Sequence, residues 1–123
     1  ICYHFFNQNI LFTGDTLFSL GCGKIFEGTY EQMFSSLQLI KSFPKDTKIY
    51  CGHEYTLKNS NFCLKYDKNN SALKEKILSI KENFKKGLPS IPSTLQDELN
   101  CNIFLRSKDI ETFSKLRDLK DNF

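Results

Sequence analysis

The stretch "TGDTLFSLGCGKIFEGTYEQMF" at residues 13–34 decides the fold, because a glycine-rich segment in it leads directly into an amphipathic helix. Residues 14–29 contain four glycines, which exclude a regular helix there. We therefore expect residues 14–29 to form a long loop. Because polar and charged side chains are embedded in it, this loop is a candidate for carrying functional residues.

The segment that follows the loop predicts a helix over residues 30–43. Its apolar residues recur at a spacing near 3.6: Met33, Phe34, Leu37 and Ile40. Thr29 and Gln32 have the spacing of a capping box at the start of this helix. Pro44 is expected to end it.

Apolar runs on both sides of this unit predict strands. Residues 1–6 and 9–13 are separated by the turn-compatible pair Asn7-Gln8, and residues 47–52 form a third run. The order strand, strand, loop, helix, strand indicates an α/β unit. We expect strands 1–6 and 9–13 to be exposed apolar edges of a sheet, so that the isolated chain self-associates.

The second half of the chain predicts helices. Helical patterns cover residues 57–67, 71–86, 95–101 and 108–121, and a Gly/Pro-containing extended linker spans residues 87–94. Thr94 is suited to cap the third of these helices. We therefore divide the chain into an α/β region, residues 1–56, and a helical region, residues 57–123.

Composition narrows the class of protein. The chain has 123 residues, of which 40% are hydrophobic and 25% are charged, so it should fold into a globular domain. A net charge of +3 is too weak to indicate a nucleic-acid partner, and no apolar run approaches the roughly 18 residues of a membrane span. The five cysteines are odd in number and form no CxxC pair, which favours reduced thiols in a cytoplasmic protein.

Two residues stand where a metal could bind. Asp15 follows the strand predicted at 9–13, and His53 follows the strand predicted at 47–52. Carboxylate and imidazole groups at the ends of two neighbouring strands could converge on one ion. His4 is the other histidine, and we interpret it as a strand residue.

Several motifs together resemble one enzyme family. They are "FTGDTLF" at 12–18, "GCGKIFEGT" at 21–29, "YCGHEYT" at 50–56 and "PSTLQDE" at 92–98. In this order they resemble hydroxyacylglutathione hydrolase, or glyoxalase II. The resemblance implies the C-terminal part of a metallo-β-lactamase αββα sandwich, followed by an all-α C-terminal domain. It also implies hydrolysis of S-(2-hydroxyacyl)glutathione, such as S-D-lactoylglutathione, to a 2-hydroxy acid and glutathione in methylglyoxal detoxification.

The family uses two divalent metal ions, zinc or iron and manganese, to activate a hydroxide. The resemblance implies that Asp15 is the bridging aspartate and that His53 is the last histidine of the metal site. The HxHxDH motif that supplies other ligands does not occur in this sequence. We therefore expect the N-terminal half of the fold to be missing, and the isolated chain to retain metal poorly and to be inactive.

The resemblance also implies a glutathione site at the junction of the two regions, formed by Lys24, Phe26, Tyr55, Arg117 and Lys120. Phe26 stands where many relatives have tyrosine, so a hydroxyl contact is expected to be lost. Arg117 and Lys120 are three residues apart, so a helix would place both cations on one face, where they could meet one carboxylate.

Two alternatives to a hydrolase half remain at this level. One is a non-catalytic glutathione-binding remnant of a split or truncated gene. The other is a related glutathione-persulfide dioxygenase with one iron. The segment "KIFEGT" at 24–29 and the long helical C-terminus favour the hydrolase over the dioxygenase.

Overall fold

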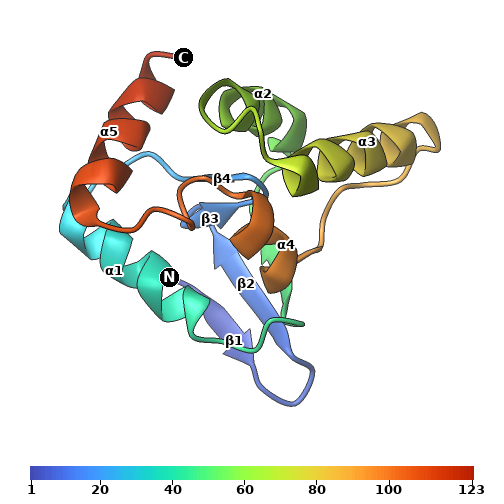
Figure 1. Cartoon of the computed structure of the whole chain (residues 1–123). Coiled ribbons are helices and arrows are strands. Elements are labelled where there is room, and N and C mark those ends of the chain that lie inside the picture. Colours follow the sequence, from blue (N-terminus) through green and yellow to red (C-terminus); the bar gives the residue numbers. More distant parts are fainter.

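A four-stranded sheet takes its strands from both regions of the chain. The computed structural model describes all 123 residues, with five helices and two small sheets (Figure 1). The larger sheet has the order β1-β2-β5-β6, with β1 at Tyr3–Phe5, β2 at Ile10–Gly14, β5 at Lys48–Cys51 and β6 at Ser93–Thr94. β1 pairs antiparallel with β2, β2 pairs parallel with β5, and β5 pairs antiparallel with β6. The predicted adjacent strands and the α/β arrangement are therefore confirmed.

The helix α1 (Tyr30–Lys41) connects the two parallel strands β2 and β5. Its capping box is present: the Thr29 side chain accepts from the Gln32 backbone N–H, and the Gln32 side chain accepts from the Thr29 backbone N–H. The helix ends at Lys41, two residues earlier than predicted. Leu37 and Ile40 on its buried face pack towards the sheet.

The glycine-rich segment at residues 14–29 is not a loop throughout, so the prediction of one long loop is wrong for residues 17–22. It contains a second, two-stranded sheet formed by β3 (Leu17–Phe18) and β4 (Gly21–Cys22). Its turn includes Leu20, which is fully buried and has a φ of 60°. We call residues 17–22 the buried hairpin.

The remaining helices lie close to their predicted positions: α2 at Thr56–Tyr66, α3 at Ser71–Lys85, α4 at Leu95–Cys101 and α5 at Ile110–Asp121. Three of them begin with side-chain caps, from Asn70, Thr94 and Asp109. The linker before α4 is extended, and its last two residues form β6, which the sequence did not predict as a strand. None of the five helices combines the length and the apolar character needed to cross a membrane.

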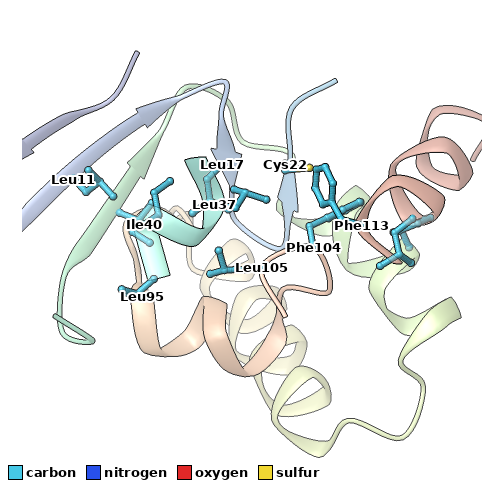
Figure 2. Packing of buried hydrophobic residues seen from close by; sticks show 12 residues of the cluster. Leu11, Leu17, Cys22, Leu37, Ile40, Leu95, Phe104, Leu105 and Phe113 are labelled. Carbon is cyan, nitrogen blue, oxygen red and sulfur yellow. The ribbon is translucent and has the colours of Figure 1, made fainter. Parts of the chain in front are cut away.

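The main hydrophobic core joins the two regions. Figure 2 shows Leu11, Leu17 and Leu37 of the α/β region together with Leu95, Leu105 and Phe113 of the helical region. A second cluster lies among the helices and takes in Leu20 from the buried hairpin. The hairpin is therefore packed against both clusters rather than exposed as a surface loop.

The sheet buries only one of its faces. Leu11 and Ile49 point into the core, whereas an aromatic face points outwards, formed by Tyr3, Phe5, Phe12 and Tyr50. Phe12 contacts both Phe5 and Tyr50, with ring centroids 5.7 and 5.3 Å away. The expectation that both N-terminal strands are edges is wrong for β2, because it pairs on both sides; β1 is an edge strand.

Candidate functional site

Asp15 and His53 meet at one edge of the sheet. They follow β2 and β5, and because these strands are parallel neighbours, their carboxyl ends lie side by side. The Asp15 Oδ1 atom is 3.3 Å from the His53 Nε2 atom, and both side chains are at least half exposed. Gly52 makes this approach possible, because a Cβ there would lie 2.9 Å from Asp15 Oδ1. The predicted convergence of Asp15 and His53 is thus present.

Aromatic rings form one wall beside this pair. The His53 ring stacks on the Tyr55 ring at a centroid distance of 4.9 Å and an interplanar angle of 12°. Phe18 of the buried hairpin meets both rings edge-on, at 6.0 and 5.1 Å. The ring of His53 is therefore held between the sheet edge and this wall.

Glu54, which lies between His53 and Tyr55, accepts hydrogen bonds from its neighbour Thr56 and from Ser90 of the helical region. It accepts hydrogen bonds from the Thr56 hydroxyl at 2.5 Å and from the Ser90 backbone N–H at 3.2 Å. Burial of the Glu54 carboxyl works to raise its pKa, but the hydrogen bonds from Ser90 and Thr56 outweigh burial and lower the pKa. Glu54 thereby ties the segment that carries His53 to the linker before α4.

A cavity of about 430 Å³ opens beside Asp15 and His53. All seven residues predicted for the site line it: Asp15, Lys24, Phe26, His53, Tyr55, Arg117 and Lys120. They come from the glycine-rich segment, from the segment after β5 and from α5. The structure therefore brings the predicted residues together, while their individual roles stay predictions.

Arg117 is more deeply placed than its predicted role required. Its side chain is almost completely buried and donates to the Cys22 carbonyl at 2.6 Å and to the Gly23 carbonyl at 3.3 Å. It also pairs with Asp121 at 2.9 Å. Burial raises the pKa of the adjacent Cys22 thiol to about 11, although Arg117 acts to lower it. Arg117 thus supports the cavity wall, and its Nε atom is buried without a hydrogen-bond partner.

Lys120 lies one helical turn after Arg117, as the three-residue spacing predicted. Its ammonium group lies over the rings of Phe62 and Phe123, at 5.8 and 5.7 Å from their centroids. Partial burial, together with the positive charges of Arg117 and Lys58, lowers the pKa of Lys120. An anion in the cavity would relieve this repulsion between like charges.

Sequence reasoning missed two further polar residues of the cavity, Lys58 and Asn59. Both lie in the first turn of α2, three and four residues after Tyr55, so helical spacing from Tyr55 could have identified them. It also missed Phe18, Cys22 and Gly23, which line the cavity because the buried hairpin forms.

The donor set for a metal is short in this chain. No group of three or more His, Cys, Asp or Glu side chains is arranged to hold an ion. Protein zinc sites use three or four protein ligands, so Asp15 and His53 alone do not make up such a site. His4 lies in β1, as predicted, and its ring packs against Phe6 and Phe43.

The amino-acid sequence of the chain is similar to those of known proteins. Residues 54–123 match the family described as hydroxyacylglutathione hydrolase C-terminus. The whole chain is 65% identical to a hydroxyacylglutathione hydrolase of Pelagibacter ubique (strain HTCC1062), of which it covers 52%. It is 50% identical over 91% of its length to one of Prochlorococcus marinus (strain MIT 9301), of which it covers 46%, and 42% identical over its full length to one of Rhizobium meliloti (strain 1021), of which it covers 54%. The chain thus spans about half the length of the curated relatives it matches.

Proposed function

The chain belongs to the hydroxyacylglutathione hydrolase family, and from this premise we propose that it is the glutathione-binding half of a thioesterase that hydrolyses S-(2-hydroxyacyl)glutathione. The observation that carries the proposal is the cavity in which a carboxylate–imidazole pair and a cluster of cations face one another. The substrate class includes S-D-lactoylglutathione, and the reaction would belong to methylglyoxal detoxification.

The charge of the cavity supports an anionic thioester as ligand. Lys24, Lys58 and Lys120 line it, and Asp15 is the acidic residue among the lining side chains. Glutathione carries two carboxylates, so lysine ammonium groups can hold it by charge-assisted hydrogen bonds. The cavity volume of about 430 Å³ lies within the usual range for small-molecule sites.

In this proposal the residues of the chain bind and orient the substrate. Lys120 and Lys24 hold carboxylate groups, while Tyr55 packs against the peptide part. Arg117 supports the same site indirectly. Its guanidinium donates to the Cys22 and Gly23 carbonyls and so fixes the backbone next to Lys24. Phe26 is 88% exposed at the cavity mouth and offers an apolar contact where a tyrosine would also offer a hydroxyl.

Two divalent metal ions would supply the hydroxide in the complete enzyme. Asp15 and His53 provide two donors, and by the ligand count above they do not fit a two-ion centre on their own. We propose that the remaining ligands come from the other half of the protein, as the length of the relatives suggests.

The same upstream half would cover the aromatic face of the sheet. Tyr3, Phe5 and Phe12 are 62%, 50% and 43% exposed there. Such exposure is unusual for aromatic rings on a sheet whose other face is buried in the core. We propose that this sheet is one layer of a metallo-β-lactamase-like sandwich in the complete enzyme. The five unpaired cysteines suit the reducing cytoplasm as the location.

A fusion tests this function. The upstream half of the Pelagibacter ubique relative would be joined to Ile1 of this chain, and the isolated chain would serve as its control. We expect the fusion to hydrolyse S-D-lactoylglutathione and to hold two metal ions after dialysis, whereas the isolated chain holds well under one equivalent and is inactive. A fusion that binds S-methylglutathione without hydrolysis would favour the non-catalytic remnant, and oxidation of glutathione persulfide would favour the dioxygenase.

A further inference from the structure

The turn of the buried hairpin is held by side chains of the helical region. All four backbone carbonyls of residues 18–21 accept hydrogen bonds from outside the hairpin. Asn102 Nδ2 donates to the carbonyls of Phe18 and Gly21, at 3.3 and 3.0 Å. Asn59 Nδ2 donates to the carbonyl of Ser19 at 3.1 Å, and the Cys63 thiol donates to that of Leu20 at 3.2 Å.

Glu98 makes the bond that the other three residues cannot make. Its Oε1 atom accepts the Leu20 backbone N–H at 2.8 Å and an N–H of Asn102 at 3.0 Å. An acceptor is required at this position, because Asn59, Cys63 and Asn102 act as donors to the hairpin and only Glu98 accepts from it. Glu98, Asn102 and Leu20 are all fully buried, so water cannot replace a lost bond.

The turn also contains a residue, Leu20, whose backbone conformation is strained. Leu20 has a φ of 60°, in the left-handed region that non-glycine residues rarely adopt. Such a residue persists when its surroundings determine it, and here the surroundings are Glu98, Cys63 and the apolar cluster around Leu20. Without the bond to Glu98, the strain at Leu20 favours a different conformation of the turn.

The other end of the hairpin carries the candidate site. Its two arms lead to Asp15 on one side and to Lys24 on the other, and they meet through the bond from Gly23 N–H to the Thr16 carbonyl at 3.3 Å. The approach is so close that a Cβ on Gly23 would collide with the Asp15 carbonyl. A shift of the turn would therefore move Asp15 and Lys24 relative to His53.

We propose that Glu98 is a positioning residue that fixes the buried hairpin and thereby sets the places of Asp15, Phe18 and Lys24 in the cavity. It does not line the cavity, and it acts through Leu20. Burial raises the pKa of Glu98 to about 6, against the hydrogen bonds from Leu20 and Asn102, so an ionised carboxylate is maintained there at a cost. A group that is costly to bury and is used to hold a strained turn fits a positioning role.

Hydrogen exchange tests the proposal without relying on the proposed reaction. In the fusion described above, Glu98→Ala should speed exchange of the amides of residues 17–24 by about 10- to 100-fold, because one buried bond to the turn is lost. The amides of β2 and β5 should keep their rates. Glu98→Gln keeps an acceptor oxygen for Leu20 N–H and should restore most of the protection.

Asp97→Asn is the matched control, because Asp97 precedes Glu98 on the same helix and pairs with Lys76 instead of the hairpin. It should leave exchange at residues 17–24 unchanged. A uniform rise across the hairpin, β2 and β5 in Glu98→Ala would show that Glu98 supports the fold as a whole, and unchanged hairpin rates would show that it holds nothing; either result overturns the proposal.

The kinetic readout rests on the proposed function. Glu98→Ala should lower kcat/KM for S-D-lactoylglutathione in the folded fraction about tenfold, and Glu98→Gln should recover most of it. If the unsubstituted fusion has no activity, the proposed function fails, while the exchange data still decide the role of Glu98.

Discussion

The α/β region and the helical region differ in how far they bury their apolar side chains. The α/β region leaves the aromatic face of its sheet open, with Tyr3, Phe5 and Phe12 exposed. The helical region packs α2, α3 and α4 around a closed cluster and also holds the buried hairpin of its neighbour. We infer from this difference that the helical region is the scaffold of the candidate site. The α/β region supplies the groups at the sheet edge, and the aromatic face of its sheet is exposed.

Replacing Asp15 should give the largest effect and should separate chemistry from support. In the fusion, Asp15→Ala should lower kcat roughly thousandfold, since metal-assisted stabilisation of the transition state is worth several kcal/mol. The melting temperature of the metal-free fusion should change little, because the Asp15 side chain is 73% exposed in this chain. Steady-state kinetics and a thermal melt check both parts. A kcat within tenfold of the parent would remove Asp15 from the proposed centre.

Replacing the two cations of α5 should give the next largest effect. Lys120→Ala and Arg117→Ala should each lower kcat/KM about 10- to 100-fold, mainly through KM. In the proposed function Lys120 contacts a carboxylate far from the thioester, equally in ground and transition states, and Arg117 holds the carbonyls beside Lys24 that position this lysine. Arg117→Ala should in addition lower the melting temperature, since Arg117 is buried against Cys22 and Gly23.

Lys115→Ala provides the control on the same helix, because Lys115 is 72% exposed and pairs only with Glu111. It should change neither KM nor stability. An unchanged KM in both Arg117→Ala and Lys120→Ala would mean that α5 binds no part of the substrate.

A smaller effect concerns pH and the scaffold. The pKa of Glu98 is raised from 4.5 to about 6 by burial, so the folded state binds its proton more tightly than the unfolded state does. This contribution to the free energy of unfolding is fully present below pH 4.5 and is lost as the pH rises through about 6. The loss is about 2 kcal/mol. The nearby Lys76 and Asp97 form an ion pair 2.9 Å apart.

Chemical denaturation of the fusion between pH 4 and pH 7 measures this slope. Glu98→Gln cannot titrate, so its stability curve should be flatter than that of the parent by the same amount. Equal slopes in the two proteins would assign the pH dependence to other groups.

The smallest effect concerns the open aromatic face. In the isolated chain, Phe12→Lys should weaken self-association about five- to tenfold, because part of an aromatic surface is no longer buried between copies. Leu78→Lys is the matched control, since Leu78 is a 68% exposed apolar residue on α3 in the closed region. Sedimentation equilibrium gives both dissociation constants, and equal weakening by the two changes would erase the difference between the regions.

Local patterns predicted most of the helices and the meeting of Asp15 and His53. The helices have clear periodicity and caps, such as Thr29 with Gln32, and two parallel strands must end at the same edge. The buried hairpin was missed because its strands have two residues each, and its hydrogen-bond partners in the helical region lie between 40 and 95 residues further along the chain. Distant contacts of this kind leave no periodic signal in the hairpin itself.

The site shows the same division. Spacing alone placed Arg117 and Lys120 on one helical face, and both line the cavity. It could not reveal that Arg117 is buried, because its partners Cys22 and Gly23 are reached only through the tertiary fold. Lys58 was missed although it follows Tyr55 by three residues, a spacing that local reasoning could have used.

The pairing of β6 with β5 has a consequence during synthesis of the protein. Strand β5 ends at Cys51, but its antiparallel partner begins only at Ser93, on the far side of two helices. Translation at about 5–20 residues per second leaves that side of β5 without its partner for roughly two to eight seconds. In this interval the backbone groups of Lys48 and Ile49 that later face β6 are open to other extended chains. The nascent protein is therefore most vulnerable to wrong strand pairing while α2 and α3 leave the ribosome, a hazard that ends when Ser93 and Thr94 arrive.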